Sequence, residues 1–119
     1  MIGAIIGDIV GSRFEFGAAP KEGFDLFTED CSYTDDTICT IAIADAILNG
    51  RDYQDSLLDW CKRYPDPMGG YGSWFDEWLH AEHPQPMNSY GNGSAMRVSS
   101  IGWLFDEWGD VIEEAAKSA

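Results

Sequence analysis

The sequence predicts an all-α protein with a single domain over residues 1–119. Three observations favour this class. An apolar segment at residues 2–13 carries a glycine at every fourth position, residues 35–48 are apolar almost throughout, and no two segments alternate as paired strands would. With 45% hydrophobic residues, the chain is able to bury a core.

The first expected helix, residues 2–13, is unusual because of its glycines. Gly3, Gly7 and Gly11 lie four positions apart, so they form a stripe without side chains on one face. Each glycine costs the helix about 1 kcal/mol relative to alanine. We therefore expect another backbone or a ligand to approach this stripe closely. If the helix continues, three polar residues also share a face: Asp8, Ser12 and Glu15.

Residues 35–48 predict a buried helix, because apolar side chains cover most of its circumference. The helix starts at the run Thr34-Asp35-Asp36-Thr37. Thr34 or Asp35 can cap it by accepting hydrogen bonds from backbone N–H groups of the first turn. Capping requires only one of these residues, so the second carboxylate needs a further reason.

Adjacent carboxylates at the end of a buried helix suggest a cation site. Burying Asp35 and Asp36 is costly unless they are paired or bind a cation. Oxygen ligands of this kind suit Mg²⁺, Ca²⁺ or Mn²⁺. A capping box at the surface with one extra charge is the alternative, and it needs no metal.

Start and stop signals predict four more helices. The first starts at Asp52 or Asp55 and ends before Pro65. The other three are expected at residues 74–79, 94–105 and 110–117. Glycine and proline recur in the two expected loops, residues 16–33 and 80–93. We expect the large aromatic side chains to lie in the core: Trp60, Trp74, Trp78, Trp103 and Trp108.

A glycine-rich loop is the second candidate site. Gly91 and Gly93 flank Asn92 directly before an expected helix, and such a loop can point backbone N–H groups at an anion such as phosphate. Ser89 adds a hydroxyl group, and the ring of Tyr90 could stack on a base. An ordinary glycine-rich turn explains the loop equally well when it is taken alone.

Composition excludes several classes of function. The formal net charge of −14 argues against binding to a nucleic-acid backbone, which requires basic surface. No apolar run has the length of a membrane span, and the apolar N-terminal run lacks the basic region of a signal peptide. Cys31, Cys39 and Cys61 are odd in number and lack metal-type spacing. We expect them to be reduced thiols of a cytoplasmic protein.

Three stretches stand in order along the chain. They are GAIIGDIVGS at residues 3–12 followed by Glu15, YTDDT at residues 33–37, and YGNGSAMRV at residues 90–98. Each is a weak signal alone, but their order and spacing on a helical background are specific. Together they resemble the ADP-ribosylglycohydrolase family.

The resemblance implies an all-α, orthogonally packed fold around a two-metal site that usually holds Mg²⁺ or Mn²⁺. It implies a hydrolase that removes ADP-ribose from ADP-ribosylated proteins or small ADP-ribosyl compounds by cleaving an N- or O-glycosidic bond. By resemblance, Thr34, Asp35 and Asp36 bind metal, and Glu15, Asp35 and Asp36 are catalytic. The substrate's diphosphate and adenosine side would contact six residues: Ser89, Tyr90, Gly91, Asn92, Gly93 and Met96.

The sequence departs from the family in one respect. Family members are usually more than twice as long and carry a second acidic cluster, Asp-x-Asp-Thr/Ser, that completes the metal pair; residues 1–119 contain no such motif. Three interpretations fit the absence of the second cluster. Residues 1–119 are an N-terminal portion of a longer protein, or a second chain or a homo-oligomer completes the site, or the protein is a remnant that has lost the reaction. We therefore expect a hydrolase that needs a second half, with a non-catalytic ADP-ribose-binding or interaction module as the alternative.

Overall fold

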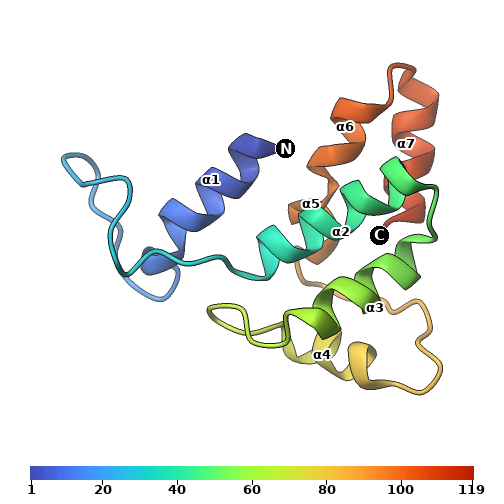
Figure 1. Cartoon of the computed structure of the whole chain (residues 1–119), viewed down its shortest axis with the longest axis horizontal. Helices are drawn as coiled ribbons and strands as arrows, with labels where there is room; N and C mark the ends of the chain where they lie inside the picture. Colours follow the sequence, from blue (N-terminus) through green and yellow to red (C-terminus); the bar gives the residue numbers. More distant parts are fainter.

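The computed structural model describes all of residues 1–119 and contains helices, turns and irregular segments but no strand. The all-α prediction is confirmed. The chain runs through α1 (Ile2–Gly11), η1 (Ser12–Phe14), α2 (Asp35–Asn49), α3 (Tyr53–Arg63), α4 (Ser73–His80), α5 (Gly93–Met96), η2 (Val98–Ser100), α6 (Ile101–Leu104) and α7 (Trp108–Lys117). No helix has both the length and the apolar character needed to cross a membrane. Figure 1 shows α2 in the centre, with α3 and α4 below it and α5 to α7 on one side.

Helix α2 is the buried helix that the sequence predicts. Thr34 is its N-cap, and the Thr34 hydroxyl accepts a hydrogen bond from the backbone N–H of Asp36. Gly50 ends the helix at φ 61°, in the left-handed region where glycine carries no steric penalty. Cys39, Ala42 and Ile43 are fully buried, so the interior of the fold is built around this helix.

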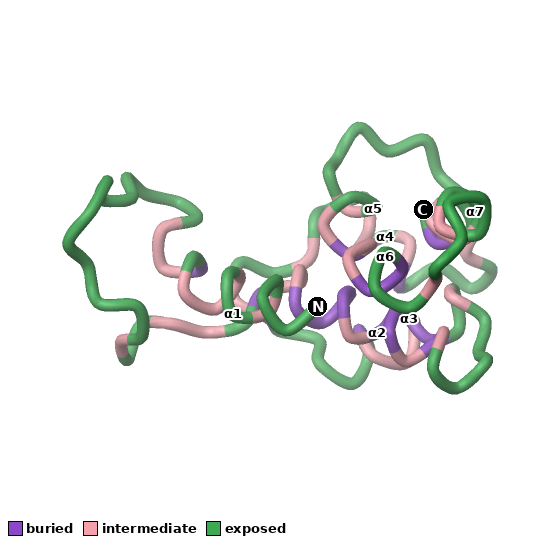
Figure 2. Tube along the Cα trace, turned by 90° about the horizontal axis from the view of Figure 1, so that it is seen from above, coloured by how far each residue is buried: buried purple, intermediate pink, exposed green.

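The hydrophobic core joins α2 to α3, α4 and α6. It consists of Ile38, Cys39, Ala42, Ile43, Leu57, Cys61, Leu79 and Ile101. The Sγ atoms of Cys39 and Cys61 lie 4.0 Å apart, and all three cysteines are free thiols. Because this core lies on one side of the molecule, α1 and the loop at residues 15–34 extend away from it (Figure 2).

Helix α1 packs more loosely than its apolar sequence suggests. None of its residues is buried, and Ile2 is 70% exposed. A Cβ atom added at Gly3, Gly7 or Gly11 would meet nothing within 4 Å. Within residues 1–119 no other backbone approaches the glycine stripe, so that half of the expectation is wrong. The other half, a ligand beside the stripe, stays a prediction.

Two further predictions are corrected by the structure. The helix expected at residues 94–105 is broken into α5, η2 and α6, because Ser99, Ser100 and Gly102 are poor helix formers in its interior. The tryptophans are not uniformly core residues. Trp60 and Trp78 are half-buried, but three are exposed: Trp74, Trp103 and Trp108.

We predict that Ile43→Ala lowers the free energy of unfolding by about 2–5 kcal/mol, because Ile43 is fully buried in the core and the substitution leaves a cavity. Leu48→Ala is the matched control on the same helix, since Leu48 is 65% exposed. Urea denaturation followed by circular dichroism measures both. Equal effects of the two substitutions would contradict the assigned core.

Candidate functional site

The carboxylate of Asp8, on α1, accepts hydrogen bonds from residues at the N-terminus of α2. Its Oδ2 accepts a hydrogen bond from the Thr34 backbone N–H at 3.0 Å and from the Thr37 hydroxyl at 2.5 Å, and its Oδ1 accepts one from the Thr34 hydroxyl at 2.6 Å. Ser12, one turn later on the same face, accepts from the Ser32 backbone N–H at 3.1 Å. One face of the first helical segment is thus fixed against the start of α2.

An acidic pocket of about 550 Å³ lies between these two helices. It is lined by Gly7, Asp8, Gly11, Ser12, Glu15, Phe16, Thr34, Asp35, Asp36, Gly69, Gly70, Tyr71, Gly72 and Asn92. The pocket therefore brings together the predicted metal and catalytic residues, which are separated by about twenty positions in the sequence. Asp8 is the residue that sequence reasoning left out of the site, although its place on the same helix face as Glu15 was a usable signal.

The turn after α3 forms the wall of the acidic pocket opposite α1. The backbone N–H of Met68 bonds to the Tyr33 carbonyl at 3.1 Å, which ties this turn to the approach of α2. Gly69 and Gly70 have φ angles of 83° and 73°, a conformation that other residues rarely adopt. A Cβ atom at Gly69 would lie 3.2 Å from Oε2 of Glu15, so glycine also leaves room for that carboxylate.

The acidic pocket disfavours the charged form of its own carboxyl groups. Burial, with the nearby charges of Asp36 and Glu15, raises the pKa of Asp35 to about 6. The pKa of Asp36 is raised as well, by burial and by the charge of Asp8. Neither Asp35 nor Asp36 takes part in an ion pair. A bound cation would relieve this repulsion.

The donor set in the acidic pocket is incomplete for a metal ion. No group of three or more His, Cys, Asp or Glu residues is arranged to hold one. Two carboxylates and the hydroxyl of Thr34 are available, and that hydroxyl already donates to Asp8. Thr34, Asp35 and Asp36 therefore remain predicted ligands that need further donors.

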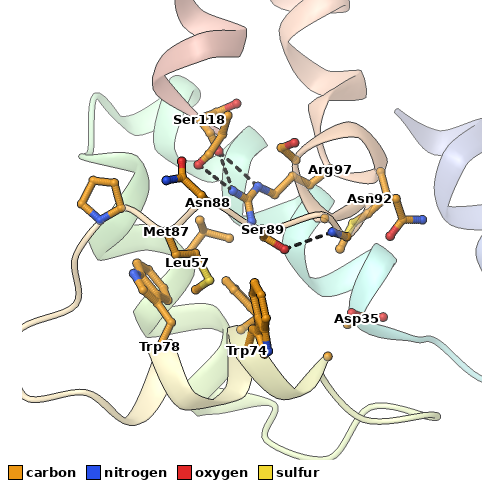
Figure 3. A pocket seen from close by; sticks show the side chains of 18 of the residues that line it. Asp35, Leu57, Trp74, Trp78, Met87, Asn88, Ser89, Asn92, Arg97 and Ser118 are labelled. Carbon is orange, nitrogen blue, oxygen red and sulfur yellow. Dashed lines mark hydrogen bonds between the residues drawn. The ribbon is translucent and has the colours of Figure 1, made fainter.

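The glycine-rich loop lines a second cavity, of about 730 Å³ (Figure 3). All six predicted substrate-binding residues line it: Ser89, Tyr90, Gly91, Asn92, Gly93 and Met96. The Ser89 hydroxyl accepts a hydrogen bond from the Gly91 N–H at 3.1 Å and stabilises the loop. Tyr90 is 99% exposed, so its ring is free to stack on a ligand.

The two cavities adjoin. Asp35, Gly72 and Asn92 line both of them. A ligand that occupied the glycine-loop cavity could therefore extend one end to the acidic pair. The prediction that the glycine loop binds phosphate is weakened by the helix that follows it. Helix α5 has only four residues and therefore supplies little helix dipole to an anion.

The sequence matches the ADP-ribosylglycohydrolase family over residues 1–119. The chain belongs to this family. A curated relative, ADP-ribosylhydrolase ARH3 from Xenopus tropicalis, is 28% identical over 148 aligned positions, which cover 99% of the chain and 42% of the relative. The chain thus spans less than half the length of that family member, and no solved structure matches it significantly.

We predict that Asp35 makes the metal-free protein less stable as the pH rises. Its folded pKa of about 6 lies above the ordinary value of 3.8, so ionisation costs more in the folded state. Asp35→Asn removes this cost, and the variant should gain stability relative to the parent between pH 4 and pH 7. Urea denaturation at pH 4 and at pH 7, with a chelator present, measures the free energy of unfolding of the variant and of the parent.

The matched control is Asp30→Asn, because Asp30 is exposed on the loop before α2. Its stability relative to the parent should stay constant over the same pH range. A constant difference for Asp35→Asn as well would show that Asp35 titrates normally.

Proposed function

We propose that this chain forms the substrate-facing part of a metal-dependent hydrolase that removes ADP-ribose from ADP-ribosylated proteins or small ADP-ribosyl compounds. The observation that carries the proposal is the junction of the acidic pocket with the glycine-loop cavity at Asp35, Gly72 and Asn92. An ADP-ribosyl group has a ribose at one end of a diphosphate and adenosine at the other. Membership of the ADP-ribosylglycohydrolase family supports this choice of substrate.

The acidic pocket fits Mg²⁺ or Mn²⁺ in its chemistry. Its donors are hard oxygens, and the Asp35 and Asp36 carboxylates repel each other without a cation. Thr34, Asp35 and Asp36 would hold the ion. When bound, paired ions of this kind orient ribose hydroxyls and lower the pKa of a bound water.

The chain's own residues then have distinct tasks in the hydrolysis. Asp8 fixes the Thr34 hydroxyl and the start of α2, so the two carboxylates keep their position. Glu15 lines the same pocket, and in this proposal its carboxylate accepts a proton from the attacking water. Water adds at C1 of the ribose as the bond from C1 to the leaving group breaks, through a transition state with oxocarbenium character. The leaving nitrogen or oxygen departs with the bonding electron pair and takes up a proton from solvent.

Further ligands must come from outside residues 1–119, because these residues contain no third metal-binding carboxylate in position. We propose that another segment of polypeptide, in the same chain, in a partner or in a second copy, completes the site. Several large apolar side chains are exposed, and another segment could cover them. They include Ile2, Trp103, Trp108 and Ile112.

Release of ADP-ribose tests the proposal. The purified chain is incubated with ADP-ribosylated protein in the presence and absence of Mn²⁺ or Mg²⁺. Metal-dependent release is expected, by the chain alone or after addition of a polypeptide that supplies a second acidic cluster. Binding of ADP-ribose without release under either condition would instead favour the alternative, a non-catalytic module that binds ADP-ribose; the incomplete donor set is the observation in its favour.

We predict that Asp35→Ala and Asp36→Ala each abolish binding of Mg²⁺ and Mn²⁺ while α2 remains folded, because Thr34 and not Asp35 caps the helix. Isothermal titration calorimetry measures the binding, and circular dichroism checks the fold. Asp30→Ala, at an exposed position, is the control that should bind like the parent. Metal binding by both site variants at the parent's affinity would refute the assignment.

A further inference from the structure

We propose that Cys39 and Cys61 are a redox-active dithiol that forms a reversible disulfide between α2 and α3. The inference goes beyond the proposed function and does not depend on it. Three observations carry it: the two sulfur atoms are neighbours in the core, they lie at the open end of two consecutive helices, and the acidic pocket is built on that same end.

The two sulfur atoms lie next to each other in the core. The Sγ atoms of Cys39 and Cys61 are 4.0 Å apart, and both side chains are fully buried. A disulfide bond holds its sulfurs about 2.05 Å apart, so an approach of about 2 Å completes the bond. The third cysteine, Cys31, is partly exposed on the loop before α2. We therefore expect oxidation of the folded chain to join Cys39 to Cys61.

The two cysteines stand at the open end of a helix pair. Cys39 lies in the second turn of α2, and Cys61 lies in the last turn of α3. Residues 50–52 join the two helices at the other end, so α3 runs back along α2 (Figure 1). A disulfide would close residues 39–61 into a loop, and such a loop stabilises a fold by restricting the unfolded chain.

The acidic pocket is built on this same end of the helix pair. Asp35 precedes Cys39 by one turn and lies on the same face of α2. Beyond Cys61, the hydroxyl of Tyr71 donates to the Tyr64 carbonyl at 2.7 Å, and Tyr71 lines the acidic pocket. A bond between the two cysteines therefore fixes the spacing between the helix that carries Asp35 and the helix to which Tyr71 is attached.

The reaction is a thiol–disulfide exchange with a small-molecule disulfide such as oxidised glutathione. The hydrogen bond between the two thiols lowers the pKa of Cys61 and, together with burial, raises the pKa of Cys39. Cys61 therefore supplies the first thiolate. Its sulfur attacks one sulfur of the oxidant, whose S–S bond breaks, and the other half leaves as a thiolate with the bonding electrons. The Cys39 sulfur then loses its proton and displaces the second half from Cys61 in the same way.

The exchange is balanced by the oxidant alone. The two cysteine thiols lose two electrons and two protons, and the oxidant disulfide becomes two thiols. Because both cysteine sulfurs are buried, the oxidant reaches them when the end of α3 moves away from α2. The equilibrium between dithiol and disulfide is independent of that route, so the equilibrium is the quantity that tests the inference.

A purely structural role for the two cysteines makes a different prediction. Buried free cysteines can act only as small apolar side chains. In that case the helices would be strained by a bond between them, and the disulfide would be no more favourable in the folded chain than in the unfolded one. A redox-active pair requires that folding favour the disulfide.

The test is equilibration of Cys31→Ser with reduced and oxidised glutathione, in native buffer and in concentrated urea. After an acid quench, free thiols are alkylated, and the intact mass gives the ratio of disulfide to dithiol. We expect this ratio to be at least about tenfold higher in the folded chain than in urea. Trypsin would leave Cys31 and Cys39 on one peptide, residues 22–51. In Cys31→Ser, a link between peptides 22–51 and 52–62 therefore identifies the Cys39–Cys61 bond.

The matched control is Cys39→Ala in the same Cys31→Ser background, which should show a glutathione adduct at Cys61 but no internal disulfide. If Cys31→Ser does not fold, the parent is used and is cleaved after acidic residues, because Asp35 and Asp36 separate Cys31 from Cys39.

A ratio in the folded chain equal to or below the ratio in urea would overturn the inference, as would a disulfide that joins two chains. Both results would leave the proposed function standing, because the hydrolysis uses neither thiol. Failure of the chain to bind Mn²⁺ or to release ADP-ribose would count against the proposed function and would leave the redox equilibrium unaffected.

Discussion

The hydrogen bonds accepted by Asp8 connect α1 to the rest of the molecule, and the whole acidic pocket depends on them. Helix α1 has no buried residue, so apolar packing does little to hold it in place. A single carboxylate instead accepts hydrogen bonds from Thr34 and Thr37, at the end of α2 that emerges from the core. Hydrogen bonds to a charged group are stronger than neutral ones, and here they also determine where Glu15 lies.

The site combines an acidic pocket and a glycine-loop cavity around the start of α2. At the start of α2, carboxylates stand close together without cationic partners, and the pKa of Asp35 is raised accordingly. On the other side of Asp35, the cavity is lined by Arg97 and the glycine loop. A cation at the acidic end would offset the repulsion that raises the pKa of Asp35. The proposed ADP-ribosyl ligand would extend across both cavities, which share Asp35, Gly72 and Asn92.

Much of this arrangement could be predicted from the sequence, because it depends on local signals. The cap at Thr34, the stop at Gly50 and the burial of α2 follow from residue types within one helix. The family resemblance implies that Glu15 lies with Asp35 and Asp36, and the structure places these residues in one pocket. Their roles as ligands and catalysts remain predictions.

The remaining features depend on contacts that no local pattern reveals. The hydrogen bond that Thr37 donates to Asp8 joins residues 29 positions apart, and the one that Arg97 donates to Ser118 joins residues 21 positions apart. The break of the expected helix at residues 94–105 arises from small residues whose helix propensity is only a weak constraint. Trp103 and Trp108 are exposed because residues 1–119 provide no surface to cover them, which aromatic content cannot indicate.

Anomalous diffraction from crystals of the chain grown with Mn²⁺ tests the metal site most directly. We expect an anomalous peak within coordination distance of the Asp35 and Asp36 carboxylates and the Thr34 hydroxyl, in the pocket that Asp8 and Glu15 also line. A peak at another position, or none at saturating Mn²⁺ in a crystal that leaves the pocket open, would contradict the metal site.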